Sequence, residues 1–538
     1  MVNRSVPLAH SRMPRLTGLA CEPMPACRTP LTLTLRLRPC RPHSARLVTD
    51  VVEGVQAPLS RKAFQQRFGA DPRDIALVDR WARNEGLKVL RRDPARRAVD
   101  VRGPTLALAA LFRANVVRYS GGGATWMSRV GALRLPAALS PMVVDVFGFD
   151  QCPMTRHDAF PLARETKRTV DRAFTAPELA DWYAYPEADG QGQTVGVIAL
   201  GGGYRESDLR AYFKGLKLPQ PRFTAVSVLG AHNDPTGRSA QMDGEVGGDI
   251  QTVGALVPGA HIVVYFAPNT ERGFVAAVAH AVHDQKWKPS VLSISWGRNE
   301  MHWSRRTLRL FDELLMEAAL MGITVCCASG DTGALADSRD HIPHVCFPAA
   351  SAWVVACGGT SLAARRAGRI VEYAWSNETG ASGSGTSALC ARPHWQGRSR
   401  KASHVGRRVP DVAANADPKS PYRVYINGAW HVGAGTSAAA PMWAGLVARL
   451  NQLRGAPIGL LTPALYKHAH ALVKHRALRR VPVSRGRPVP PGAGWAPHTG
   501  LGVPHGRDLA KALARLRPVT PPPRPRQGGS ARRAGRKP

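Results

Sequence analysis

The sequence predicts an α/β protein with a doubly wound parallel β-sheet, preceded by a smaller α+β unit. At 538 residues the chain is too long for one simple hydrophobic core, so two domains are expected. Between residues 194 and 328, apolar segments of strand length alternate with segments of helix length, which indicates a parallel sheet with right-handed crossovers. The strands are expected at 194–200, 222–229, 261–266, 291–296 and 323–328, and the helices between them at 206–215, 241–256, 271–284 and 306–321.

Changes in composition divide the chain into five parts. Residues 1–28 carry Arg, Pro and Met without periodicity, and we expect them to be unstructured. Residues 29–140 form the expected α+β domain, and residues 141–175, with several prolines, have the composition of a linker. The larger domain is expected at 176–516. The tail 517–538 carries seven Lys or Arg and no acid among Pro, Gly and Ser, which predicts disorder.

The chain is strongly basic, with a formal net charge of +35 at pH 7. This charge raises nucleic-acid binding as a hypothesis. The basic residues are spread along the chain, however, without zinc-ligand spacing or a nucleic-acid module, so nonspecific binding of anions is the expected consequence. No apolar run reaches about 18 residues, which predicts a soluble protein without a membrane span. Adjacent Cys326 and Cys327 would point to opposite faces of a strand, which favours core residues over a disulfide.

A serine nucleophile is predicted in the segment 435–441, Gly-Thr-Ser-Ala-Ala-Ala-Pro. The Gly-Thr turn exposes the hydroxyl of Ser437, and the proline suits the start of the apolar helix that follows. The alternative is a serine that merely caps this helix. A serine nucleophile needs a base within hydrogen-bond reach, and no histidine lies in the His-Gly-Thr setting of an Asp-His-Ser triad.

Carboxylates are the remaining candidates for the base. Glu245 and Asp249 are four residues apart in an expected helix, so both project from one face, and their repulsion raises at least one pKa. Such a pair is usually a solvated surface feature, but the apolar strand at 261–266 beside it suggests burial. Asp331 follows the strand at 323–328, at the end of a parallel sheet where ligands bind. It is either a turn residue or half of an aspartic dyad, whose second copy the chain lacks.

Together these segments resemble the sedolisin family of serine-carboxyl peptidases, and within it the kumamolisin-like members. The matching segments follow the family order from about residue 176 to about residue 515: 197–204, 245–249, 255–260, 264–269, 293–297, 328–331, 410–412 and 435–437. A looser match over 60–69 and 74–82 resembles the activation prodomain of the family. The resemblance implies a subtilisin-like fold for the larger domain and a serine-type endopeptidase made as a zymogen.

The resemblance also implies a role for each site residue. Ser437 would attack the peptide carbonyl and form an acyl-enzyme, Glu245 would act as general base, and Asp249 would orient Glu245. Asp331 would donate a hydrogen bond to the oxyanion, which requires a protonated carboxyl and therefore acid pH. Trp296 is either a member of this carboxylate network or a core residue at the end of a strand.

The chain departs from the family pattern in three places. Ala199 stands where kumamolisin-like members carry a Glu of the carboxylate network, and Gly247-Gly248 replaces bulkier residues in the catalytic helix. Family members bind one Ca²⁺ near the C-terminus, but Arg480 and Ala496 occupy the positions of its two carboxylate ligands. Because Ca²⁺ needs oxygen ligands with carboxylate charge, we expect no metal at this position and no cofactor.

The family resemblance implies polypeptide substrates, a prodomain that inhibits its own catalytic domain, a monomer, and an extracellular location. No signal peptide is recognisable in the sequence. Two alternative functions stay open: a catalytically weak or inactive homologue that binds peptides, and a nonspecific nucleic-acid binder. The complete set of Ser437, Glu245, Asp249 and Asp331 weighs against the first, and the absence of a nucleic-acid module weighs against the second.

Overall fold

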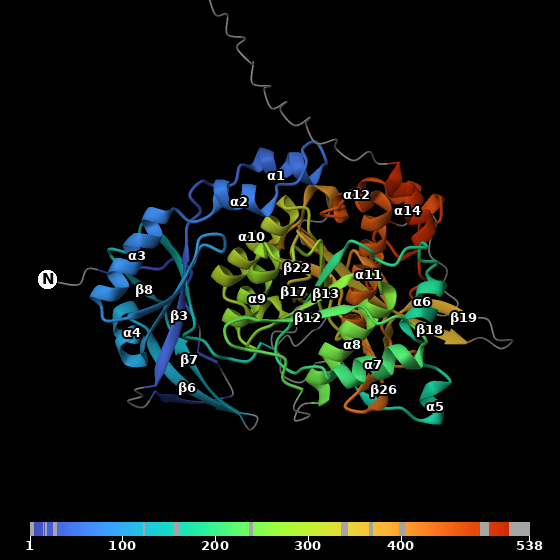
Figure 1. Ribbon diagram of the computed structural model, residues 1–538, viewed down its shortest axis with the longest axis horizontal. Coiled ribbons are helices and arrows are strands. Elements are labelled where there is room, and N and C mark those ends of the chain that lie inside the picture. Colours follow the sequence, from blue (N-terminus) through green and yellow to red (C-terminus); the bar gives the residue numbers. More distant parts are fainter. Residues whose placement is uncertain are drawn as a thin grey trace, which may run out of the picture.

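The computed structural model describes residues 5–13, 15–16, 19–24, 29–121, 124–154, 162–235, 240–334, 343–364, 370–397, 405–484 and 494–515. A smaller N-terminal domain lies beside a larger C-terminal domain, and its helices α1 (Ala45–Val52) and α2 (Arg61–Phe68) reach over the larger one (Figure 1). None of the described helices combines the length and the apolar character needed to cross a membrane. The tail 517–538, predicted to be disordered, falls outside the described residues.

Seven parallel strands form the centre of the larger domain. Their order is β12 (Arg222–Ser227), β13 (His261–Phe266), β11 (Thr194–Ala199), β14 (Val291–Ile294), β16 (Thr324–Ala328), β18 (Val355–Ala364) and β24 (Val412–Asn415). An eighth strand, β19 (Ile370–Ala374), pairs antiparallel with the end of β18. The predicted α/β class with a parallel sheet is confirmed. All nine elements expected between residues 194 and 328 are present, with bounds that differ by at most two residues.

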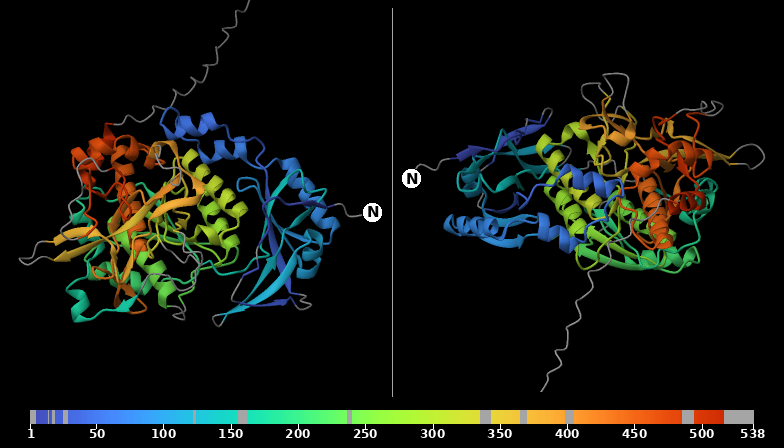
Figure 2. Two further views of the ribbon diagram at one scale, coloured as in Figure 1. Left: turned by 180° about the vertical axis from the view of Figure 1, so that it is seen from behind. Right: turned by 90° about the horizontal axis from the view of Figure 1, so that it is seen from above.

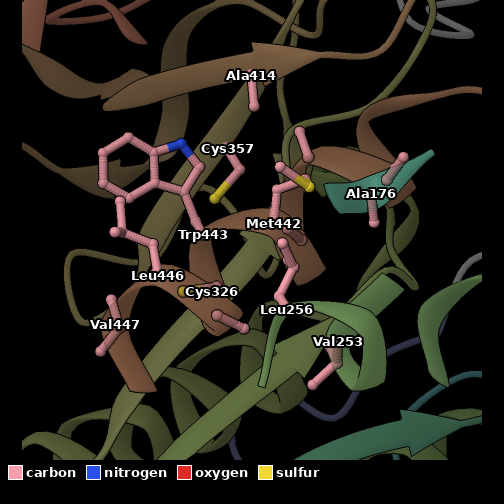
Figure 3. Packing of buried hydrophobic residues seen from close by; sticks show 14 of the residues in the cluster. Ala176, Val253, Leu256, Cys326, Cys357, Ala414, Met442, Trp443, Leu446 and Val447 are labelled. Carbon is pink, nitrogen blue, oxygen red and sulfur yellow. The ribbon is translucent and has the colours of Figure 1, made fainter. Parts of the chain in front are cut away.

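Helices cover both faces of this sheet. The first face packs against α7 (Glu206–Gly215), α8 (Ala240–Leu256) and α11 (Thr436–Arg454), and the second against α9 (Glu271–His283) and α10 (Arg305–Leu320). Figure 3 shows Trp443 and Leu446 of α11 beside Cys326 and Cys357 of the sheet. Cys327 lies in the hydrophobic cluster on the second face, so the two adjacent cysteines do point in opposite directions. All eight described cysteines are free thiols.

Shorter elements complete the larger domain. The remaining helices are α5 (Lys167–Val170), α6 (Ala176–Trp182), α12 (Thr462–Lys467), α13 (Ala469–Lys474) and α14 (Gly506–Ala514). Antiparallel pairs are formed by β15 (Arg298–Asn299) with β17 (Cys346–Phe347), β20 (Ser376–Asn377) with β21 (Gly380–Ala381), β22 (Gly385–Ala391) with β23 (Gly406–Val409), and β27 (Leu478–Arg479) with β28 (Val503–Pro504). A small sheet is formed by β10 (Ala163–Arg164), β26 (Ala429–Gly433) and β25 (Tyr422–Ile426), of which β25 and β26 lie just before the predicted nucleophile in sequence.

The N-terminal domain is built on an antiparallel sheet, in agreement with the predicted α+β class. Its strand order is β4 (Lys88–Asp93), β5 (Ala98–Pro104), β3 (Pro30–Leu37) and β9 (Val143–Phe147), with helices α3 (Pro72–Asn84) and α4 (Thr105–Phe112). The strand β9 lies in the segment that we expected to be linker, so the domain continues beyond residue 140. The apolar residues of β9 pair with β3, more than a hundred positions earlier, and this partner is not visible in the local sequence.

The N-terminal segment also differs from the expectation. Within residues 1–28, which we expected to be unstructured, β1 (Ser5–Pro7) pairs with β8 (Arg134–Pro136). Likewise β2 (Ala20–Pro23) extends a hairpin of β6 (Asn115–Gly121) and β7 (Ala124–Val130). Both strands are short and gain their order from distant partners, so periodicity within the segment does not reveal them.

The two domains are held together by apolar and charged contacts. Leu47, Val51, Phe64 and Phe68 of α1 and α2 belong to the hydrophobic cluster that covers the second face of the central sheet. Next to them, Nη2 of Arg97 lies 2.6 Å from Oε1 of Glu317 in α10. Both views in Figure 2 show the N-terminal domain against the side of the larger domain that carries α9 and α10.

Candidate active site

The predicted nucleophile lies at the start of α11. Ser437 is the second residue of this helix and is 6 % exposed, and Gly435 is its N-cap with φ 119° and ψ 165°. Only glycine adopts this backbone conformation at low cost. A Cβ atom on Gly435 would also lie 2.5 Å from Oδ2 of Asp331. The turn before the nucleophile therefore requires glycine for two independent reasons.

Asp331 is held by the same turn. It follows β16, and its Oδ1 accepts hydrogen bonds from the amide of Thr436 at 2.7 Å and from Oγ1 of Thr436 at 2.8 Å. The amide of Gly330 donates in turn to Oγ1 of Thr436 at 3.0 Å. Because Oδ1 accepts two hydrogen bonds, a proton on this carboxyl belongs on Oδ2, the oxygen that faces Gly435. The structure thus brings Asp331 to the turn that carries Ser437.

Glu245 and Asp249 lie one turn apart on α8 and are 2 % and 3 % exposed, which excludes a solvated surface pair. Burial raises the pKa of Asp249 well above its ordinary value. The charge of Glu245 adds to this effect, and a hydrogen bond from Ser295 opposes it. Two carboxyls coupled in this way hold one proton between them over a range of acid pH. The raised pKa favours a proton on Asp249 at acid pH.

Ser295, to which the sequence assigned no role, connects the acid pair to the nucleophile. Its Oγ donates to Oδ1 of Asp249 at 2.7 Å and lies 3.1 Å from the carbonyl oxygen of Ser437. The two partners are 46 and 142 positions away in sequence, so no local pattern could identify the contact. Thr436 was missed in the same way, although it lies inside the motif that identified Ser437.

Trp296 follows Ser295 directly and is 4 % exposed. It belongs to the hydrophobic cluster that also contains Leu200, Trp303 and Phe347. This placement fits the core-packing alternative, and the role of Trp296 in the carboxylate network stays a prediction.

Two departures from the family pattern have structural counterparts in this region. Ala199 ends β11 and is fully buried in the hydrophobic cluster that also contains Val246 and Ile250 of α8, so this position adds no charge to the acid pair. At Gly247, a Cβ atom would lie 2.2 Å from Cδ1 of Ile426. This glycine therefore allows α8 to pack closely against β25.

The C-terminal loop does not fit a Ca²⁺ ion. Carbonyl oxygens of the loop already accept backbone amides of the same loop, at Ala496, Thr499 and Gly500. The guanidinium of Arg479 pairs with the buried carboxylate of Glu372. Next along the chain, Arg480 lies against Gly502 of the loop, and its buried Nε has no hydrogen-bond partner in the described part of the chain. Ca²⁺ needs carboxylate charge as well as carbonyl oxygens, and neither Arg480 nor Ala496 supplies it.

The chain is similar to known peptidases over both domains. The family described as "Pro-kumamolisin, activation domain" matches residues 29–152, and the subtilase family matches residues 227–487. Kumamolisin from Bacillus sp. (strain MN-32) is 40% identical over 474 residues, which cover 85% of this chain and 86% of that protein. Sedolisin from Pseudomonas sp. (strain 101) is 26% identical over 443 residues, 76% and 73% of the two chains. The solved structure of Pseudomonas sedolisin with two molecules of pseudo-iodotyrostatin has a TM-score of 0.55 at 25% identity, and covers 64% of this chain and 99% of its own.

Proposed function

Because this chain belongs to the sedolisin family of serine-carboxyl peptidases and carries the activation domain of its kumamolisin-like members, we propose that it is an acid-active endopeptidase made as a self-processing proenzyme. The observation that carries the proposal is the meeting of three elements at one turn. The nucleophile turn of α11 holds Asp331 from the end of β16, while Ser295 joins the buried acid pair of α8 to the same turn.

In the proposed mechanism, Oγ of Ser437 attacks the peptide carbonyl while a carboxylate oxygen of Glu245 takes its proton. Asp249, which holds the shared proton, orients Glu245 and limits the charge of the pair. Protonated Asp331 donates from Oδ2 to the oxyanion that forms on the carbonyl oxygen. The proton on Glu245 then passes to the leaving amine, and the acyl group stays on Ser437 as an ester. Water then takes the place of the amine and attacks this ester. Glu245 takes a proton from the water, and Oγ of Ser437 takes that proton back as it leaves.

This mechanism restricts activity to acid pH. Glu245 must be ionised while Asp331 is protonated, so the two carboxyls must have different pKa values and the pH must lie between them. Above this range Asp331 loses its proton, and its negative charge would repel the oxyanion that it has to stabilise.

Self-processing is supported by the course of the chain between the domains. The segment of β10 pairs antiparallel with β26, Ala163 opposite Val432 and Arg164 opposite His431. The strand β26 leads within four residues to Ser437. Leu162 packs against the helix of the acid pair, since a Cβ atom on Gly244 would lie 3.2 Å from Cδ2 of Leu162. We propose that cleavage of this linker releases a mature fragment beginning between about residues 160 and 178.

Acidification of the purified full-length chain tests this proposal. The wild-type chain should cut itself, and the fragment can be identified by intact mass. Ser437→Ala should stay uncut, because removal of Oγ removes the nucleophile. Self-cleavage of pure Ser437→Ala would refute the assignment. A stable, uncut wild-type chain that still binds peptides would support the alternative of an inactive homologue, which the loss of a carboxylate at Ala199 motivates. A monomeric state and an extracellular location are further proposals from the family resemblance.

A further inference from the structure

The hydroxyl of Ser295 faces two acceptors but has one hydrogen to donate. Oδ1 of Asp249 is the closer acceptor, at 2.7 Å, and the carbonyl oxygen of Ser437 lies at 3.1 Å. The first acceptor belongs to the acid pair on α8, and the second to the backbone of the nucleophile on α11. Ser295 therefore contacts both halves of the proposed catalytic machinery.

The carbonyl of Ser437 is available because of a proline. In an α-helix this oxygen would accept the amide four residues later, which is residue 441. Pro441 lies inside α11 and has no N–H to donate. Since the carbonyl of Ser437 has lost its helical donor, the hydroxyl of Ser295 can share its single hydrogen between this oxygen and Oδ1 of Asp249 as a three-centre hydrogen bond. This contact fixes the first turn of α11 against the end of β14.

The contact also distinguishes the two oxygens of Asp249. Oδ1 accepts the hydrogen bond from Ser295, whereas Oδ2 is buried and has no hydrogen-bond partner within the described residues. A proton on Asp249 therefore belongs on Oδ2. In kumamolisin-like members a Glu from the position of Ala199 would contribute to the carboxylate network, but here that position is apolar. Ser295 and Glu245 are the groups that act on the charge of Asp249.

We propose that Ser295 is a positioning residue for catalysis, which fixes the orientation of Asp249 and ties the acid pair to the backbone of the nucleophile. This inference rests on the proposed function of Ser437 and Glu245. Ser295 forms no bond with substrate in this proposal. It acts by selecting the oxygen of Asp249 that carries the proton, and by holding α11 and α8 in register at the reacting atoms.

The test is the pH dependence of kcat and KM for a soluble peptide substrate, measured between pH 3 and 7 on acid-matured enzyme. Ser295→Ala should lower kcat by roughly 10- to 100-fold with KM little changed, because misplacement of the acid pair affects the reaction more than binding. The hydrogen bond from Ser295 stabilises the ionised pair. Its loss should therefore move the acid limb of the kcat profile upward by about one pH unit.

Three further variants make the result decisive. Ser293→Ala is the matched control, since Ser293 lies two residues earlier on β14 and its buried Oγ has no hydrogen-bond partner in the described structure. It should keep the wild-type profile. Ser295→Thr keeps a hydroxyl and should restore the position of the acid limb. If Ser295→Ala does not fold, Ser295→Cys has nearly the size of serine with a weak donor, and should show the shifted limb.

A wild-type kcat and acid limb in Ser295→Ala or Ser295→Cys would overturn the inference, as would an equal effect in Ser293→Ala. Ser437→Ala, assayed in parallel, separates this outcome from a failure of the proposed function. An inactive Ser437→Ala beside an unaffected Ser295 variant contradicts only the role of Ser295. An active Ser437→Ala contradicts the assignment of the nucleophile itself.

Discussion

Gly435 occupies the most restrictive position in the site. Its φ and ψ belong to a region that only glycine enters readily, and a Cβ atom there would collide with Oδ2 of Asp331. In the proposed mechanism, that oxygen donates to the oxyanion. The residue that permits the turn is thus also the residue that permits Asp331 to lie beside the nucleophile.

Gly435→Ala should therefore reduce peptidase activity by two orders of magnitude or more, since displacement of Asp331 removes an oxyanion donor. The strained backbone should in addition lower the free energy of unfolding by about 1–3 kcal/mol. Gly428→Ala is the matched control, because Gly428 also has a positive φ, 80°, but has open space where its Cβ would lie. It should lose stability only. Peptidase activity is measured with a peptide substrate. Equal activity in the two variants would show that the space beside Oδ2 of Asp331 is not critical for catalysis.

The candidate site could be predicted from sequence where its residues belong to a local pattern. The spacing of Glu245 and Asp249 predicted one shared face, and a strand-end position pointed to Asp331. Ser295 and Thr436 could not be assigned in this way, because their roles arise from partners on other elements.

At the scale of elements, the alternation of strands and helices in the larger domain was predicted closely. The apolar strand β13 and the amphipathic helix α7 have the bounds expected from sequence. The strand β13 is a continuous apolar run because it is buried on both faces of the sheet, and α7 shows helical periodicity because one of its faces is buried. The short strands β1, β2 and β9 were not predicted, since each is ordered by a partner far away in the chain.

The C-terminal loop from residue 494 to residue 502 should bind no calcium. Its carbonyls are committed to backbone amides, and arginines stand near it where a carboxylate ligand would be needed. A chelator should leave both the melting temperature and the peptidase activity unchanged, and elemental analysis of the purified protein should find no stoichiometric calcium. One tightly held calcium ion per chain, or a large loss of stability with a chelator, would show that other oxygens complete a site.

At the scale of the whole molecule, docking of the N-terminal domain is linked to pH. Burial, followed by the positive charge of Arg96 from the N-terminal domain, lowers the pKa of His280 to about 4 from an ordinary value of 6.5. The undocked form therefore binds this proton more strongly, so His280 by itself opposes docking as the pH falls from about 6.5 to about 4. Asp145 acts in the opposite sense, because burial, against the charge of Arg306, raises its pKa to about 6.

His280→Gln should weaken this dependence. In the uncleavable Ser437→Ala chain, protection of the amides of α2 against hydrogen exchange reports docking at each pH between 6.5 and 4. The added His280→Gln change should raise this protection at pH 4 relative to the parent and leave it nearly unchanged at pH 6.5, since it removes a group that must otherwise stay neutral on docking. His475→Gln, at an exposed position after α13, serves as the control. An identical pH response in His280→Gln and the Ser437→Ala parent would contradict this linkage.

The most direct test of the carboxylate-driven serine mechanism is the pH profile of peptide-bond cleavage by acid-matured enzyme, from pH 3 to pH 8. We expect a maximum below about pH 5.5, because Asp331 must be neutral to donate to the oxyanion. Asp331→Asn should lose on the order of 10²-fold or more in turnover, although the side-chain amide oxygen can still accept hydrogen bonds from Thr436. Glu245→Gln should lose more, because it removes the base. Full activity at pH 8, or an active Glu245→Gln variant, would contradict the mechanism and point to a base other than Glu245.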